Sequence, residues 1–189
     1  MRNPLIYLKN LIRVVGLKAR YNNRLSVGWI QSFDKLRIEI GKYAMAKIGS
    51  CNQNREKLYI GVHEEGKLTI GSHCFFNINS SITCLEYIEI GDNCKFGNNL
   101  VIVDHDHNFR AYGNYSHRTP EFLSSPIRIG NNVWVGANVT ILRGTTIGDN
   151  CVIGAGSTVK GDYPNNSIII PNVTNRMTKW GGVQYDAQN

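Results

Sequence analysis

Apolar residues recur every six positions through the second half of the chain. The unbroken series is Ile129, Val135, Ile141, Ile147, Ile153 and Val159. An earlier series has the same period with one two-residue shift: Ile70, Phe76, Ile82, Ile88, Ile90, Phe96 and Ile102. A period of six fits neither an α-helix nor a simple strand alternation. It predicts an all-β solenoid, a parallel β-helix in which three hexads form the three sides of one coil.

The same period assigns an inside and an outside to each hexad. The repeated sequences IGDN and IGNN follow the apolar position with glycine, which we expect to permit the corner backbone, and with Asn or Asp, which tolerate turns. A second inward position, four residues after the apolar one, holds small or β-branched residues. Cys74, Cys94 and Cys151 occupy it and are expected to pack in the core. The five cysteines form no CxxC pair, which disfavours a zinc–thiolate site or a disulfide framework.

Charge is concentrated at the N-terminus. The net charge is +7, and no acidic residue precedes Asp34. Because the rest of the chain is close to neutral, we expect no nucleic-acid partner. The sequence contains no run of about 18 apolar residues and no signal-peptide cleavage site, so we expect a cytoplasmic protein.

Three regions are predicted along the chain: residues 1–24 form a basic amphipathic helix, residues 25–173 the β-helix, and residues 174–189 a C-terminal tail. The helix places Leu5, Leu8, Leu11, Ile12 and Val15 on one face. Two roles remain open for it. In the first role, which we favour slightly, the helix caps the open end of the β-helix. In the second role it lies on an anionic membrane surface, in peripheral association with the inner face of the membrane.

Two long motifs carry a resemblance to a known family. IGDNCKFGNN, IGNNVWVGANVTILRGTTIGDNCVIGAGSTVKGD and the histidine after VIVD resemble the hexapeptide-repeat acyltransferases, in the maltose/galactoside and xenobiotic acetyltransferase branch. Capsular and lipopolysaccharide O-acetyltransferases belong to the same branch. The resemblance covers roughly residues 58–180. It implies a left-handed coil, acetyl-CoA as donor without a metal, and a homotrimer with active sites between subunits. The acceptor it implies is a sugar hydroxyl of a surface polysaccharide or its precursor.

The resemblance identifies His105, in VIVDHDHNF, as the general base. Counting from Ile102 places it near an outer corner, where the period breaks and a loop over residues 104–126 leaves the coil. An imidazole, with an ordinary pKa of about 6.5, can take the hydroxyl proton and return it to the leaving thiolate. His107 is expected to be a loop or substrate contact. Either Asp104 or Asp106 could orient an imidazole, and the sequence leaves this open.

Most other site residues follow from the same resemblance, and Tyr112 from its place in the loop over residues 104–126. Asn77 and Tyr112 are expected to contact the acceptor, and the outward Trp134 to lie near both substrates. Backbone groups around Gly136, Ala155 and Ser157 are expected to lie along the pantetheine arm. Arg176 and Lys179, with Lys160 as a third candidate, are expected to reach the 3′-phosphate. The family's GxPA(K/R) turn is replaced here by PNVTNRM, so the sequence does not determine which residues form the adenine pocket.

Three alternatives remain. An amino-sugar or nucleotide-sugar N-acetyltransferase would use much of the same machinery. A γ-carbonic-anhydrase-like metalloprotein would use His105 and His107 with a third ligand such as His73 or His117. A non-catalytic scaffold would need neither the acetyltransferase residues nor a metal site. The sequence determines neither the acceptor sugar nor the group that is modified.

Overall fold

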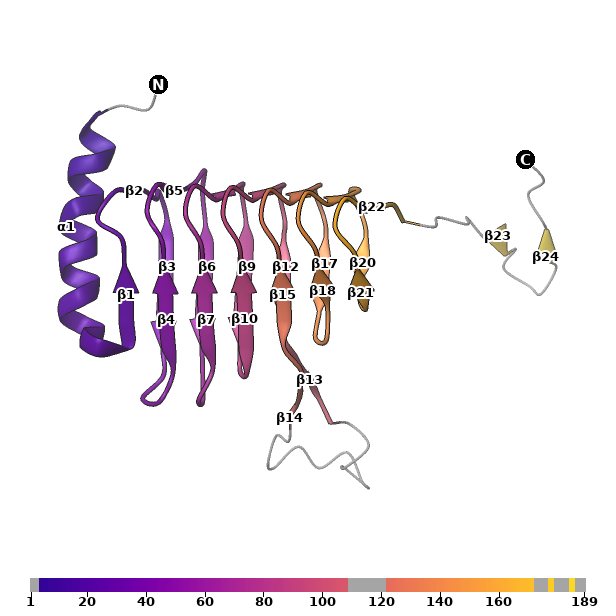
Figure 1. Cartoon of the computed structure of the whole chain (residues 1–189), viewed down its shortest axis with the longest axis horizontal. Helices are drawn as coiled ribbons and strands as arrows, with labels where there is room; N and C mark the ends of the chain where they lie inside the picture. Colours follow the sequence, from indigo (N-terminus) through magenta and orange to yellow (C-terminus); the bar gives the residue numbers. More distant parts are fainter. Residues whose placement is uncertain (1–3, 109–121, 172–176, 179–183, 186–189) are drawn as a thin grey trace.

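The computed structural model describes residues 4–108, 122–171, 177–178 and 184–185. They form a parallel β-solenoid with one N-terminal helix (Figure 1). The predicted parallel β-helix is confirmed.

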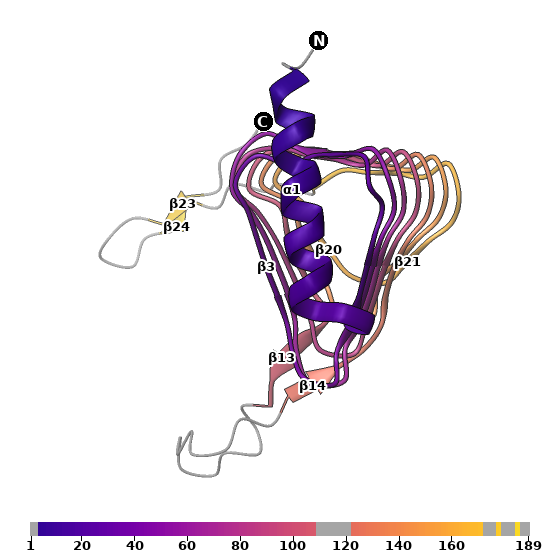
Figure 2. The same ribbon diagram turned by 90° about the vertical axis from the view of Figure 1, so that its left-hand side faces the viewer.

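Three parallel sheets form the sides of a triangular prism, and the chain visits sheets A, B and C in turn (Figure 2). Sheet A contains β1 (Leu25–Val27), β4 (Met45–Ile48), β7 (Lys67–Ile70), β10 (Tyr87–Ile90), β15 (Ile127–Ile129), β18 (Thr146–Ile147) and β21 (Asp162–Tyr163). Sheet B contains β2 (Gln31–Ser32), β5 (Asn52–Asn54), β8 (Phe75–Phe76), β11 (Lys95–Phe96), β16 (Trp134–Val135), β19 (Val152–Ile153) and β22 (Ile168–Ile169). Sheet C contains β3 (Leu36–Ile40), β6 (Leu58–Val62), β9 (Ser80–Cys84), β12 (Val101–Val103), β17 (Thr140–Leu142) and β20 (Thr158–Val159).

The core of the prism consists of the residues that the six-residue period placed inside. Ile82, Ile102 and Ile141 occupy the same register on successive coils and are fully buried. Phe76 and Phe96 stack in the same way on sheet B, with ring centroids 4.8 Å apart. The small-position residues Cys74, Cys94 and Cys151 are buried too, as predicted. Apolar burial along a continuous column therefore holds neighbouring coils together.

The corner glycines have a different role from the predicted one. The left-handed backbone conformation falls on the asparagine three positions after the apolar residue, with φ of 59° at Asn93 and 57° at Asn132. The glycine itself lies where the next coil approaches most closely. A Cβ on Gly91 would sit 2.7 Å from the backbone carbon of Gly130. Glycine is therefore required here for coil stacking, and asparagine supplies the turn.

The N-terminal helix α1 (Pro4–Tyr21), followed by the short 3-10 helix η1 (Asn22–Arg24), lies across the open end of the solenoid (Figures 1 and 2). Its buried Asn10 pairs with the backbone of Phe33: the side-chain amide donates to the carbonyl oxygen at 2.9 Å, and Oδ1 accepts from the N–H at 3.2 Å. The Tyr21 hydroxyl donates to the carbonyl of Ile38 at 2.8 Å. Polar side chains of the helix thus satisfy backbone groups that would otherwise be unpaired at the end of the solenoid.

The long excursion begins as a two-stranded antiparallel ribbon. β13 (His105–His107) pairs with β14 (Phe122–Ser124), and the ribbon projects from the corner between sheets C and A (Figure 2). A second pair, β23 (Met177–Thr178) and β24 (Gln184–Tyr185), is antiparallel as well. Within the part of the chain that the structure describes, no helix is both long and apolar enough to cross a membrane.

Candidate active site

His105 is the first residue of β13, at the C–A corner. Its side chain is 14% exposed, and its Nδ1 lies 3.0 Å from Oδ1 of Asp104. The ring of Phe122, from the paired strand, meets the imidazole edge-on with centroids 5.3 Å apart. The ring is therefore held from two sides at the point where the ribbon leaves the solenoid.

Asp104 is fully buried, and backbone amides of the preceding coil fix its carboxylate. Oδ1 accepts from the N–H of Leu85 at 2.8 Å, and Oδ2 accepts from Glu86 at 2.8 Å and from Tyr87 at 3.0 Å. A carboxylate in this position favours the imidazole tautomer that carries its proton on Nδ1, which leaves a lone pair on Nε2. The arrangement is the one that a histidine base needs from its supporting group.

The structure also decides between the two aspartates that the sequence left open. Asp106 does not contact His105 in the way that Asp104 does. Its Oδ2 instead accepts a hydrogen bond from Nε of Arg143 at 2.6 Å. Asp104 is therefore the orienting residue, and Asp106 ties the ribbon to the following coil. His107 is exposed and its ring lies against Phe122.

Cys84 lies next to this pair but is not a nucleophile. Burial, followed by the negative charge of Asp104, raises the pKa of its thiol far above the ordinary value. A thiol that stays protonated at neutral pH does not attack a thioester.

A second group of predicted residues meets in a groove on sheet B. The groove has a volume of about 400 Å³ and is lined by Asn77, Trp134, Gly136 and Ala155, together with Phe75, Lys95, Phe96, Gly97, Asn98, Val135 and Ala137. Trp134 points outward, as predicted, with 51% of its surface exposed. Gly97, Gly136 and Ala155 follow one another on successive coils, and with no side chain beyond a methyl group they leave space beside the indole.

Two predicted cofactor residues lie elsewhere. The side chain of Ser157 is turned into the solenoid, where its hydroxyl donates to the carbonyl of Gly154 at 2.7 Å, so only its backbone is left for the predicted contact with the pantetheine arm. The inward position of the hexad explains this orientation. Lys160 is exposed, but it follows β20 at the C–A corner and does not line the groove. Tyr112, Arg176 and Lys179 lie outside the described residues.

The groove and His105 are on opposite sides of the prism. Sheet B forms one side of the triangle, and the ribbon β13–β14 leaves from the corner that faces it (Figure 2). One chain therefore does not bring His105 to Trp134. A site that uses both must take them from different copies of the chain.

Sequence reasoning missed a polar hollow beside His105. It has a volume of about 480 Å³ and is lined by Tyr43, Glu65, Lys67, Leu85, Glu86, Tyr87 and Ser124. Ser124 is the residue paired with His105, so the hollow adjoins the corner that carries His105. Its residues come from outward positions of separate coils and share no motif, so no signal in the sequence marked them.

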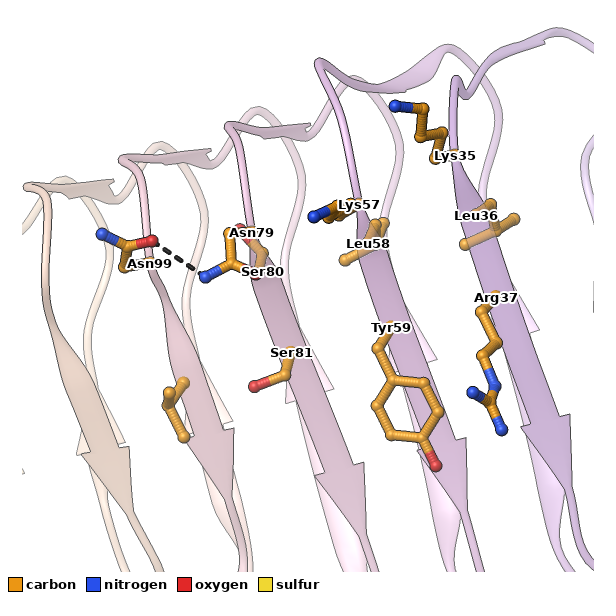
Figure 3. A pocket seen from close by; sticks show the side chains of 11 residues that line it. Lys35, Leu36, Arg37, Lys57, Leu58, Tyr59, Asn79, Ser80, Ser81 and Asn99 are labelled. Atoms are coloured by element: carbon orange, nitrogen blue, oxygen red, sulfur yellow. Dashed lines mark hydrogen bonds between the residues drawn. The ribbon is translucent and has the colours of Figure 1, made fainter.

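A third hollow, of about 520 Å³, lies on sheet C near the N-terminal coils (Figure 3). Arg37, Tyr59 and Ser81 line it from successive strands. Arg37 and Tyr59 both donate hydrogen bonds to Glu39, at 2.6 and 2.9 Å. This hollow contains none of the residues predicted for the site.

The described residues contain no cluster of side chains that could coordinate a metal ion. Their His, Cys, Asp and Glu side chains form no group of three or more. The three-histidine alternative would therefore need a residue outside the described part, such as His117.

Comparison with known proteins agrees with the geometry. Residues 126–161 match the bacterial transferase hexapeptide (six repeats) model, and residues 67–103 match the hexapeptide repeat of succinyl-transferase. Both segments of the solenoid therefore match hexapeptide-repeat family models.

Similar proteins include a probable acetyltransferase of Mycobacterium tuberculosis, 33% identical over 72% of this chain and 46% of the relative. The galactoside O-acetyltransferase of Escherichia coli is 43% identical over 52% of this chain and 47% of the relative. The chain thus spans about half the length of the curated relatives it matches. Among solved structures, a variant of AntD, an N-acyltransferase from Bacillus cereus in complex with dTDP and coenzyme A, shares the fold. Its TM-score is 0.62, with 16% identity over 93% of this chain and 88% of that one.

Proposed function

We propose that this protein is an acetyl-CoA-dependent O-acetyltransferase that modifies a sugar hydroxyl of a surface polysaccharide or its precursor. The observation that carries the proposal is the Asp104–His105 pair at an outer corner of a hexapeptide-repeat solenoid. The similarity to a galactoside O-acetyltransferase supports the reaction class.

In the proposed reaction His105 acts as general base. Nε2 takes the proton of the acceptor hydroxyl as the oxygen attacks the thioester carbonyl of acetyl-CoA. The tetrahedral intermediate collapses, the carbon–sulfur bond breaks, and the imidazolium gives its proton to the departing thiolate. The carboxylate of Asp104 stabilises the imidazolium between these two steps, because it is held in place by backbone amides and needs no reorganisation.

We further propose that the active site forms between subunits of a homotrimer. The opposite placement of His105 and the Trp134 groove supports this arrangement, because a neighbouring subunit can supply the groove that His105 lacks in its own chain. The pantetheine arm would lie along Gly136 and Ala155, where no bulky side chain obstructs it. Arg176, Lys179 and Lys160 remain candidates for the 3′-phosphate.

Acetyl-CoA consumption tests the proposal, against a panel of sugars, capsular oligomers and nucleotide amino sugars. We expect turnover with a hydroxyl acceptor, and a product whose acetyl group mild alkali removes, as it does from an ester. An alkali-stable amide formed only on amino sugars would instead establish the N-acetyltransferase. Absence of turnover with every acceptor, or unchanged turnover in the variant His105→Ala, would contradict the proposal.

A further inference from the structure

The outward face of α1 is apolar from Leu5 to Val15. Leu5, Leu8, Ile12 and Val15 are 60%, 57%, 68% and 52% exposed. Spacings of three and four residues place them in one stripe on the helix surface. The opposite face, with Asn10, Val14 and Tyr21, is the one buried against the first coil. The apolar face that the sequence marked on this helix therefore points away from the solenoid.

Basic residues border this apolar stripe. Lys9 and Arg20 are exposed on one flank. On the other side, Nζ of Lys18 lies 3.8 Å from the ring centroid of Trp29, in the first coil. No acidic residue occurs before Asp34. The end of the solenoid thus presents apolar side chains framed by positive charge, on a helix that carries no acidic residue.

The apolar surface extends beyond the helix. Trp29 and Ile30, between β1 and β2, are 55% and 58% exposed. The contact between Lys18 and Trp29 shows that this corner adjoins the helix. Tryptophan and lysine are the residues that characteristically occupy the boundary between lipid headgroups and acyl chains.

We propose that the outward face of α1 binds an anionic lipid surface, with its apolar stripe in the headgroup boundary and its basic flanks at the lipid phosphates. A second copy of the chain is a poorer occupant, because two such ends would bring the same positive charges together. Anionic lipid matches both features of the surface, apolar area and positive charge. Because α1 crosses the end of the solenoid, the prism would stand with its first coil nearest the membrane (Figures 1 and 2).

Vesicle flotation with the full-length protein tests this inference, which does not rest on the proposed enzymatic function. We expect binding to phosphatidylglycerol vesicles, weak binding to phosphatidylcholine vesicles, and weaker binding as salt rises. The double variant Leu8→Gln/Ile12→Gln should lose at least about tenfold in partitioning. Both positions are largely exposed, so the thermal midpoint should stay unchanged.

The matched control is Ile168→Gln/Ile170→Gln, at the other end of the solenoid, where both side chains are 74% exposed. It removes a similar apolar area and should leave flotation unchanged. The proposal is overturned if the wild-type protein does not float with phosphatidylglycerol vesicles, or if both double variants partition alike. Light scattering without vesicles tests the second occupant, another copy of the chain. If the wild-type protein associates with itself, only Leu8→Gln/Ile12→Gln abolishes this association, and no vesicle binding is seen, the proposal is overturned as well.

Discussion

Oδ1 of Asp104 lies 3.0 Å from Nδ1 of His105, and the same carboxylate accepts backbone hydrogen bonds from the preceding coil. The imidazole is thereby coupled to the body of the solenoid through one buried side chain. This contact gives the corner a fixed geometry, although it lies at the root of a long excursion.

Replacement of His105 by alanine is expected to lower acetyl transfer by about 10²- to 10⁴-fold, the range for a lost general base. The loss should appear in kcat at saturating acetyl-CoA. His107→Ala is the matched control and should have a much smaller effect, because His107 is exposed and is not paired with Asp104. Equal losses in the two variants would contradict the assignment of His105 as the base.

The variant Asp104→Asn should weaken both folding and catalysis. An asparagine has the same shape, but one carboxylate oxygen becomes an NH₂ group that faces backbone donors. We expect the free energy of unfolding in urea to fall by about 1.5–3 kcal/mol, the usual value of a hydrogen bond to a charged group. The kcat should fall as well, because the amide no longer stabilises the imidazolium. An unchanged urea midpoint would show that the hydrogen bonds to residues 85–87 contribute little.

Subunit mixing tests whether the site is shared. His105→Ala and Trp134→Ala should each be poorly active alone. If a trimer takes His105 from one subunit and Trp134 from the next, random mixing of the two variants restores about a quarter of the sites. The measurement is turnover after the two variants are co-expressed, compared with the two pure variants mixed without subunit exchange. A site contained in one chain predicts no recovery in either sample.

Two glycine-to-alanine changes are expected to have opposite effects on the stability of the fold. A Cβ on Gly97 would lie 2.5 Å from the backbone carbon of Gly136, so Gly97→Ala should destabilise the fold by about 1–3 kcal/mol. A Cβ on Gly16, in α1, meets nothing within 4 Å. Gly16→Ala should therefore stabilise the protein by about 0.5–1 kcal/mol through helix propensity. Thermal unfolding of both variants measures the contrast, and a stable Gly97→Ala protein would refute the stacking role.

Much of the fold followed from the period of six. Once Ile129 and Val135 are placed inside, the directions of the intervening side chains follow from strand geometry. This is why the burial of Cys151 and the exposure of Trp134 were predictable. The same reasoning places Ser157 inside, because it occupies the same hexad position as Cys151.

Roles that depend on contacts between coils were not predictable in this way. Asp104 and Asp106 look equivalent in sequence, and only the backbone amides of residues 85–87, brought alongside by stacking, distinguish them. The requirement for Gly91 likewise arises from its neighbour Gly130 in the next coil.

The sequence by itself determined the repeat and the core, because these depend on side-chain direction within one strand, whereas His105 was singled out by the family resemblance. Tertiary structure alone decided which face of α1 packs, which aspartate holds His105, and that His105 and the Trp134 groove lie on opposite sides of the prism. These relationships join residues separated by whole coils or by the width of the prism. Their distances depend on how the coils close and stack, which no local pattern encodes.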